Sequence, residues 1–297
     1  MSALEIVRDP QALRARRARW RAAGESCALV PTMGNLHAGH LSLVQAARER
    51  AGRVIVSLFV NPGQFGEGED FDAYPRTFEE DRRKLADCGV DLLFCPTVAE
   101  VYPDGWDGHT RVTVPGLSGI LCGAARPIHF TGVATVVTKL LNLAAPEVAL
   151  FGEKDYQQLT VIRRLVRDLW IPVEIVGVPT VREFDGLAMS SRNRYLTADE
   201  RARAPALYRV LRAQAAALAG GVRDFAAVSA AGMAALAAAG LEPEYFEVRR
   251  ADDLELPKPT DSQVVILAAA RLGRARLIDN VRVQLNPGLG SPIIGGP

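Results

Sequence analysis

The chain has 297 residues, of which 48% are hydrophobic and 23% are charged, and its formal net charge is +1. This length predicts one large domain or two unequal ones, with enough buried surface for a core that needs no disulfides. The balanced charge argues against a surface for nucleic acid or anionic membranes. The longest apolar runs are too short to span a bilayer.

The cysteines indicate a reducing compartment. Cys27, Cys88, Cys95 and Cys122 form neither a CxxC pair nor a Cys/His spacing typical of a metal site. Free cysteines in or beside apolar runs behave as small hydrophobic residues. The N-terminal segment has no apolar region of the signal-peptide kind. We therefore expect a cytoplasmic protein.

Short apolar runs alternate with amphipathic segments through the first 180 residues, a pattern typical of parallel strands buried on both faces. The expected strands cover 27–33, 53–60, 90–96, 148–151 and 173–181. The expected helices between them cover 41–52, 77–89, 131–145 and 156–170. This alternation predicts a doubly wound, Rossmann-like α/β domain over residues 1–182 with right-handed crossovers.

The pattern changes after residue 182. A Thr-x-x-Glu capping box (Thr197, Glu200) opens an alanine-rich stretch that predicts one long helix to residue 221, and a second helix is expected over 224–240. Three apolar segments then predict a small antiparallel sheet with a turn at Gly273; they cover 244–250, 262–273 and 274–283.

These elements predict a smaller α+β C-terminal domain over residues 183–290. We expect that domain to act as a lid over the ligand-binding site of the larger domain. The Gly/Pro-rich end, 291–297, predicts a flexible tail.

Ligands of an open parallel sheet bind beyond the carboxyl ends of the strands, where the strand order reverses. The first expected strand is followed by "MGNLHAGH", in which His37 and His40 share one face of the first helical turn. Two imidazoles beside a helix N-terminus suit the negative charge of a transferring phosphoryl group. The alternative is that both histidines only cap the helix.

Two further loops carry polar side chains at the same edge. Asn61 and Gln64 follow the second expected strand, and their neutral amides can hold a hydroxyl or a carboxylate. Lys154 follows the fourth strand, where a cation can read a phosphate, and Gln158 lies one helical turn later. The alternative for the first loop is a common Asn-Pro-Gly turn without a binding role. The alternative for the second loop is a plain charged turn with a Glu–Lys pair.

The loop after the fifth strand contains Met189, Ser190, Ser191 and Arg192. Hydroxyls beside a guanidinium suit a mobile loop that closes on polyphosphate oxygens. The alternative is a hydroxyl-rich linker between domains. Together, the four loops predict a nucleoside triphosphate site beside a neutral polar pocket.

The His-x-Gly-His motif, paired with the late Met-Ser-Ser-Arg loop, resembles the signatures of the HIGH-motif nucleotidylyl-transferase superfamily. Within it, the chain is similar to the pantoate–β-alanine ligase family. The resemblance extends over nearly the whole chain through "PTMGNLHAGHLSLV", "VSLFVNPGQF", "YPRTFEEDRRKL", "HFTGVATVVTKLLN", "FGEKDYQQLTVIRRLVRDL" and "GLAMSSRNRYL".

The resemblance implies an ATP-dependent, AMP-forming ligase of coenzyme A biosynthesis that joins (R)-pantoate to β-alanine and yields pantothenate. The pantoate carboxylate attacks the α-phosphorus of ATP and pyrophosphate leaves. The β-alanine amine then displaces AMP from pantoyl adenylate. The resemblance also implies Mg²⁺ on the triphosphate, small molecules as the only substrates, and a homodimer.

The resemblance further implies a role for individual residues. His40 is the expected proton donor, and His37, Lys154 and Arg192 complete the expected catalytic set. Gln64 and Gln158 are expected to bind pantoate, and Gln64 to bind β-alanine as well. The expected ATP-binding residues are Met33, Gly34, Asn35, Leu36, His37, Ala38, Gly39, His40, Gly152, Glu153, Lys154, Asp155, Val181, Met189, Ser190, Ser191 and Arg192.

No residue cluster resembles a dedicated metal site, and Glu80 and Asp81 are the candidates for a carboxylate that touches Mg²⁺. The chain also departs from the family at three positions. The family usually has alanine and glutamate where this chain has Asn35 and Ala38, and methionine where it has Gly63. We expect the first two to tune the site and Gly63 to loosen the pantoate pocket.

The apolar run 53–60 and the segment after it carry more apolar surface than a small sheet needs, so we expect a dimer through the larger domain. Two other functions remain open. A nucleotidylyltransferase acting on a phosphorylated acceptor would need additional cations, whereas Gln64 and Gln158 are neutral. A nucleotide sensor or tRNA-binding protein would bind ATP without turnover.

Overall fold

The computed structural model describes residues 4–66, 68, 69 and 71–285. The chain divides into two compact units. Unit 1 comprises Met1–Val181 and Met189–Ser191, and unit 2 comprises Arg182–Ala188 and Arg192–Pro297. The predicted tail, 291–297, lies outside the described residues.

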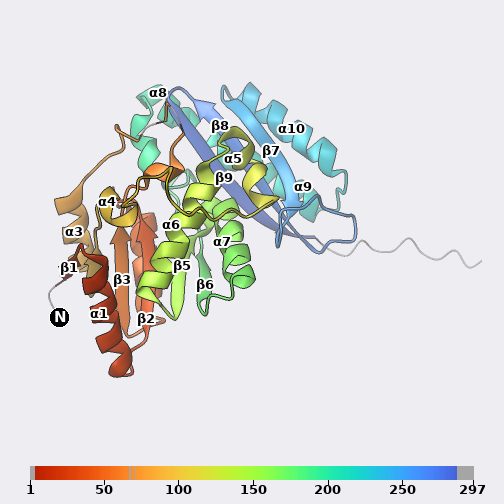
Figure 1. The fold of residues 1–297 in the computed structure, drawn as a ribbon. Helices are drawn as coiled ribbons and strands as arrows, with labels where there is room; N and C mark the ends of the chain where they lie inside the picture. The colour runs from red at the N-terminus through yellow and green to blue at the C-terminus, as the bar shows by residue number, and fades with distance from the viewer. Residues whose placement is uncertain (1–3, 67, 70, 286–297) are drawn as a thin grey trace, which may run out of the picture. The chain divides into compact units, whose positions relative to one another are not determined.

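Unit 1 contains a six-stranded parallel sheet in the order β1-β4-β3-β2-β5-β6 (Figure 1). The strands are β1 (Glu5–Val7), β2 (Cys27–Thr32), β3 (Arg53–Leu58), β4 (Leu92–Phe94), β5 (Val148–Gly152) and β6 (Glu174–Val178). From β2 the order continues through β3 and β4 on one side and through β5 and β6 on the other, so it reverses between β2 and β5. The predicted parallel α/β sheet is confirmed, but β1 was not predicted.

Helices cover both faces of this sheet. On one face, α2 (Ala38–Arg48) and α3 (Phe78–Asp87) pack on alternate strand residues such as Ala28 and Val30. The intervening Leu29 is also buried and points to the other face. There α6 (His129–Ala144) packs against α1 (Pro10–Ala22), which was not predicted, and α7 (Tyr156–Asp168). Because helices cover both of its faces, the sheet is doubly wound, as the sequence predicted.

The central residues of β3 are buried within unit 1. This strand lies between β4 and β2, and Val54, Ile55 and Val56 are at most 1% exposed. The middle of the apolar run that suggested a dimer is therefore buried within the sheet, whereas Leu58 and Val60 are partly exposed. A dimer through the larger domain stays a prediction. No helix of the described ranges is both long enough and apolar enough to cross a bilayer.

Unit 2 contains an antiparallel sheet in the order β7-β8-β9, which confirms the predicted α+β class. Its strands are β7 (Glu242–Arg250), β8 (Gln263–Leu272) and β9 (Ala275–Gln284), and its helices are α8 (Ala198–Arg203), α9 (Ala206–Ala219) and α10 (Phe225–Ala238). Gly273 lies in the turn between β8 and β9 with a φ of 56°.

The prediction of one long helix over 197–221 is wrong, because the stretch forms two helices, α8 and α9. Pro205 stands between them and has no backbone N–H with which to continue the helical hydrogen bonds. The predicted capping box is present, since Thr197 Oγ1 accepts from Glu200 N at 3.3 Å and Glu200 Oε2 accepts from Thr197 N at 2.8 Å.

Candidate active site

The loop from β2 into α2 has an unusual backbone. Gly34 and Asn35 both have positive φ values, 84° and 52°. Glycine adopts this left-handed region without steric cost, and asparagine tolerates it better than most residues. Asn35 therefore suits the turn that directs the chain from the end of β2 to the start of α2.

His37 and His40 cap α2 reciprocally. His37 precedes the helix, and its Nδ1 accepts from Gly39 N at 3.2 Å. His40 Nδ1 accepts from His37 N at 3.3 Å, and the two ring centroids are 4.1 Å apart. A Cβ on Gly39 would lie 2.9 Å from His37 Cε1, so this position needs glycine. The capping alternative raised by the sequence is therefore correct for both Nδ1 atoms.

Capping does not prevent these histidines from binding a phosphate. A backbone N–H can only donate, so each Nδ1 that accepts from one carries no proton. The neutral rings therefore hold their hydrogen on Nε2. The cap and a bound anion would use different atoms of the same ring.

Burial lowers the pKa of His40 from 6.5 to about 3. A proton on the neighbouring His37 would lower that pKa further, the charges of Lys154 and Lys84 also lower it, and Asp155 opposes them. His40 is thus neutral near pH 7 in the protein without ligand, and it can donate a hydrogen bond from Nε2. A neighbouring triphosphate would raise the pKa, because negative charge favours the imidazolium.

The loop after β5 lies beside the start of α2, where His37 and His40 are. β5 and β2 are adjacent parallel strands, with Ala28 paired to Val148. β5 ends at Gly152, and the 3₁₀ helix Glu153–Asp155 leads directly into α7. Both charged residues of this turn that act on His40, Lys154 and Asp155, belong to the predicted ATP-binding set.

The loop after β6 also reaches the start of α2. Met189 N donates to Val181 O at 3.0 Å, and a Cβ on Gly39 would lie 3.9 Å from Met189 Cβ. Ser191 is the last residue of unit 1, whereas Arg192 belongs to unit 2. The predicted contact of Arg192 with ATP stays a prediction.

Asp81 of α3 holds the β2–α2 loop. Its side chain is fully buried, and its two carboxylate oxygens accept from Asn35 N at 2.8 Å and Leu36 N at 2.7 Å. Thr77 Oγ1 donates to the same carboxylate at 3.1 Å. Lys84 Nζ donates to Leu36 O at 2.6 Å. Side chains of α3 thus satisfy three backbone polar groups of the loop.

The expectation that Glu80 or Asp81 touches Mg²⁺ finds no support in this arrangement. Asp81 already accepts from three donors, and Glu80 Oε1 lies 2.8 Å from Lys84 Nζ. The sequence did contain a signal for Asp81. Phe78, Asp81 and Leu85 have helical spacing, which places a carboxylate on the apolar face of α3, where a buried charge needs partners.

Gln64 lies beyond the end of β3 in the 3₁₀ helix Pro62–Gln64 and is 8% exposed. Its backbone carbonyl accepts from Arg126 Nη2 at 3.1 Å and from His129 Nδ1 at 2.9 Å. Its side-chain Oε1 accepts from Asn61 Nδ2 at 3.0 Å. Sequence reasoning missed Arg126 and His129, because they precede α6 or open it and are distant from Gln64 in sequence.

Gln158 and its neighbour Gln157 have different environments on α7. Gln157 is 4% exposed, and it accepts from Cys122 N at 3.1 Å and donates to Leu117 O at 2.9 Å. It therefore holds the loop before α6. Gln158 is half-buried, and its side chain forms no hydrogen bond with the residues that the structure describes. Of the two amides, Gln158 is the one available to a ligand.

His129 links the Gln64 side of the site with Asp155. Burial lowers the pKa of His129 to about 4, and the charge of Arg126 lowers it further. Asp155 raises the pKa of His129 as it raises that of His40. One carboxylate therefore acts on both the predicted triphosphate side and the predicted pantoate side.

Gly63 does not leave an opening beside Gln64. A Cβ at Gly63 would lie 2.3 Å from Cζ3 of Trp106, so the indole ring occupies the place that a larger residue would take. The loosening of the pocket expected from Gly63 therefore has no support in this geometry.

Comparisons with known proteins identify the family of the chain. Residues 5–282 match the family model for pantoate–β-alanine ligase. The chain is 57% identical over 286 residues to a pantothenate synthetase of Pseudomonas aeruginosa (strain UCBPP-PA14), covering 96% of this chain and 100% of the relative. It is 56% identical over 285 residues to that of Azotobacter vinelandii, covering 96% and 100%.

Solved structures show the same similarity. The crystal structure of pantothenate synthetase from Thermus thermophilus matches with a TM-score of 0.86 and 48% identity, covering 94% of this chain and 99% of that chain. A pantoate–β-alanine ligase from Francisella tularensis, crystallised with beta-gamma ATP and beta-alanine, matches with a TM-score of 0.79 and 34% identity, covering 94% and 97%.

We expect Asp81→Asn to weaken ATP binding about 10-fold or more. The carboxylate now accepts hydrogen bonds from two backbone N–H groups of the β2–α2 loop, and the amide N–H₂ of asparagine would face one of them and disturb that loop. Isothermal titration with ATP measures the change. Glu79→Gln is the matched control, since Glu79 lies on the same helix but its side chain is 73% exposed. ATP affinity equal to that of the unmodified protein would contradict the role of Asp81.

The buried neutral histidines predict a loss of stability in mild acid. Between pH 6.5 and the lowered pKa values of about 3 for His40 and about 4 for His129, the unfolded chain binds protons that the folded chain excludes. The free energy of unfolding should therefore decrease as the pH is lowered, by up to about 1.4 kcal/mol per pH unit for each histidine.

Urea unfolding at several pH values between about 7 and about 4.5 measures this slope. His40→Gln and His129→Gln should each reduce it by about one proton. Variants with an unchanged slope would show that these histidines titrate normally in the folded protein.

Proposed function

The chain belongs to the pantoate–β-alanine ligase family, and we propose that it carries out the ATP-dependent condensation of this family through pantoyl adenylate, at the ends of β2, β3 and β5. It is an ATP-dependent ligase that joins pantoate to β-alanine. The observation that best supports the proposed site is that the adjacent strands β2 and β5 lead into the His37–His40 turn and the Glu153–Asp155 turn, where the strand order reverses.

In the first step, the pantoate carboxylate attacks the α-phosphorus and pyrophosphate leaves. The carboxylate is already ionised, so the protein needs to orient it and stabilise charge on the phosphates. His37 and His40 would donate from Nε2 to phosphate oxygens, and the N-terminus of α2 adds partial positive charge. Lys154 would supply a full positive charge, and we assign proton donation to His40. Once bound phosphate has raised its pKa, Nδ1 would take up a proton in place of the capping hydrogen bond, and the Nε2 proton would pass to an oxygen of the leaving pyrophosphate.

In the second step, the β-alanine amine attacks the acyl carbon, the C–O bond to AMP breaks, and the proton that the amine loses passes to water. Gln64 and Gln158 would hold pantoate through neutral amides, and Gln64 would hold β-alanine. Neutral donors orient a carboxylate without the stronger stabilisation that a cation would give its charge. The nucleophile thus keeps its reactivity.

We propose that Mg²⁺ reaches the site on the triphosphate. Within the described residues, no group of three or more His, Cys, Asp or Glu side chains could hold a metal ion. Mg²⁺ commonly binds through substrate phosphates and water with few protein ligands. When bound, it neutralises phosphate charge.

Three further features belong to the proposal. Met189, Ser190, Ser191 and Arg192 would close on ATP, with the smaller domain as a lid that excludes water from the adenylate. The enzyme would work in the cytoplasm, which suits its four free cysteines. The substrates would be small molecules only.

The test of the proposed function is AMP and pyrophosphate release from ATP and Mg²⁺. Pyrophosphate should form with pantoate alone, and steady AMP release should need β-alanine as well. His40→Ala should keep the fold but slow pantoyl adenylate formation about 100-fold or more in a single turnover. Unchanged adenylation would remove His40 from its proposed role.

The same assay separates the alternatives. Turnover only with a phosphorylated acceptor would indicate a nucleotidylyltransferase instead. ATP binding without any turnover would indicate a sensor or tRNA-binding protein.

We also propose a homodimer, on the basis of the family resemblance rather than of β3. Light scattering at micromolar concentration should give twice the 32.0 kDa mass of the chain. A monomeric mass would contradict this prediction.

A further inference from the structure

Tyr102 has a buried hydroxyl that the proposed mechanism does not use. It follows α4 (Val98–Val101), is 2% exposed, and its hydroxyl donates to Asn61 Oδ1 at 2.7 Å. The ring packs edge-on against Trp106 and His109, with centroids 5.3 and 5.2 Å away. Phenylalanine would make the same ring contacts, so packing alone does not explain the hydroxyl, which costs free energy to bury.

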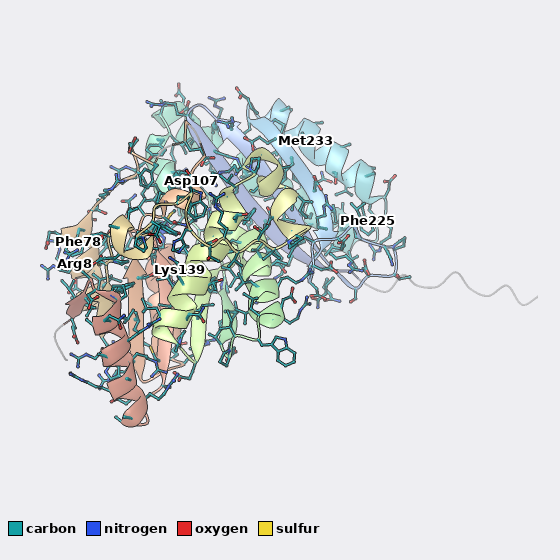
Figure 2. The ribbon with its side chains drawn as sticks, in the orientation of Figure 1. Arg8, Phe78, Asp107, Lys139, Phe225 and Met233 are labelled. Atoms are coloured by element: carbon teal, nitrogen blue, oxygen red, sulfur yellow. The ribbon has the colours of Figure 1, made fainter. Side chains whose placement is uncertain are left out.

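Lys139 fixes the position of this ring. Its Nζ lies 4.7 Å from the centroid of Tyr102 and donates to Val101 O. Figure 2 shows Lys139 on α6, the helix that also supplies Gly132. Burial lowers the pKa of Lys139. The tyrosine is thus held from the α6 side, and its hydroxyl has little freedom to leave Asn61.

Asn61 uses every hydrogen-bonding position of its side chain and is 1% exposed. Its Oδ1 accepts from Tyr102 and from Gly63 N, the latter at 3.3 Å. Its Nδ2 donates to Gln64 Oε1 at 3.0 Å and to Gly132 O at 3.1 Å. Gly63 N can only donate and Gly132 O can only accept, so the amide of Asn61 has one orientation.

This orientation decides which end of the Gln64 amide is presented to a ligand. Arg126 and His129 hold the Gln64 backbone, and Asn61 holds its Oε1. Gln64 Nε2 donates to none of the described residues, so it is the atom left for a substrate. A Gln64 amide turned by 180° would instead present its carbonyl oxygen, which repels a carboxylate.

We propose that Tyr102 is a positioning residue for pantoate, acting through Asn61 to hold the Gln64 amide with its N–H₂ group toward the substrate carboxylate. This inference rests on the proposed role of Gln64. Each hydrogen bond in the series Tyr102–Asn61–Gln64 also polarises the next. The tyrosine hydroxyl therefore makes Gln64 Nε2 a stronger donor as well as a better oriented one.

Tyr102→Phe tests the inference, because it removes the hydroxyl and keeps the ring. We expect the KM for pantoate to rise about 5-fold to 10-fold, with kcat and the KM for ATP within about twofold of the original values. Tyr208→Phe is the matched control. It removes a tyrosine hydroxyl of unit 2 that accepts from Arg212 at 3.4 Å, and it should change none of these values.

A double-mutant cycle distinguishes positioning from a general structural effect. In the Gln64→Ala background, Tyr102→Phe should have no further effect on pantoate binding, measured by calorimetry as well as by KM. An equal effect in both backgrounds would overturn the inference, and so would an unchanged KM in the single variant.

The outcomes also separate this inference from the proposed function. If the unmodified enzyme releases AMP but Tyr102→Phe binds pantoate normally, only the role of Tyr102 is wrong. If Gln64→Ala binds pantoate normally, the proposed role of Gln64 and the inference fail together. If the unmodified protein neither turns over nor binds pantoate, both the proposed function and the inference are wrong.

Discussion

The site depends on a single buried carboxylate. Two successive residues of the β2–α2 loop, Gly34 and Asn35, have left-handed backbones, and the N–H groups of Asn35 and Leu36 point to Asp81 of α3. Without that acceptor, two backbone donors in the interior would be unpaired, which costs more than an ordinary hydrogen bond returns. The loop in turn sets where α2 begins, and the start of α2 sets the position of both histidines.

The two histidines combine a structural role with the chemical role that we propose for them. Each imidazole uses Nδ1 to cap α2, and this fixes the hydrogen on Nε2. Burial keeps His40 neutral until a negative ligand arrives. The cap thus orients the rings before ATP binds, which lowers the entropy cost of assembling the site. It also explains why the histidines stand on either side of a glycine.

The site combines two electrostatic environments within one sheet edge. The ends of β2 and β5 carry Lys154, the α2 N-terminus and the two histidines, which suit phosphate. The end of β3 carries Asn61 and Gln64, whose neutral amides are ordered by further buried polar groups. Asp155 influences histidines of both environments. In the proposed mechanism, the charged triphosphate and the pantoate carboxylate would therefore meet different kinds of donor.

Local pattern in the sequence determined the fold class. Continuous apolar runs predicted β2 to β6, the His-x-Gly-His motif marked the start of α2, and alternation placed the polar loops at one edge of a parallel sheet. Pro205 was also visible in the sequence, but its break between α8 and α9 was overlooked because the alanine-rich pattern continues through it. β1 has only three residues, too few for a periodic signal.

Tertiary structure alone decided which buried polar groups meet. Asp81 lies 46 residues from Asn35 and Tyr102 lies 41 from Asn61, so their hydrogen bonds leave no local pattern. The sequence pattern of β3 likewise does not give its neighbours, and only the strand order shows that it lies between β4 and β2. Periodicity reports which face a residue takes, and it holds no information about the partner that the fold brings to that face.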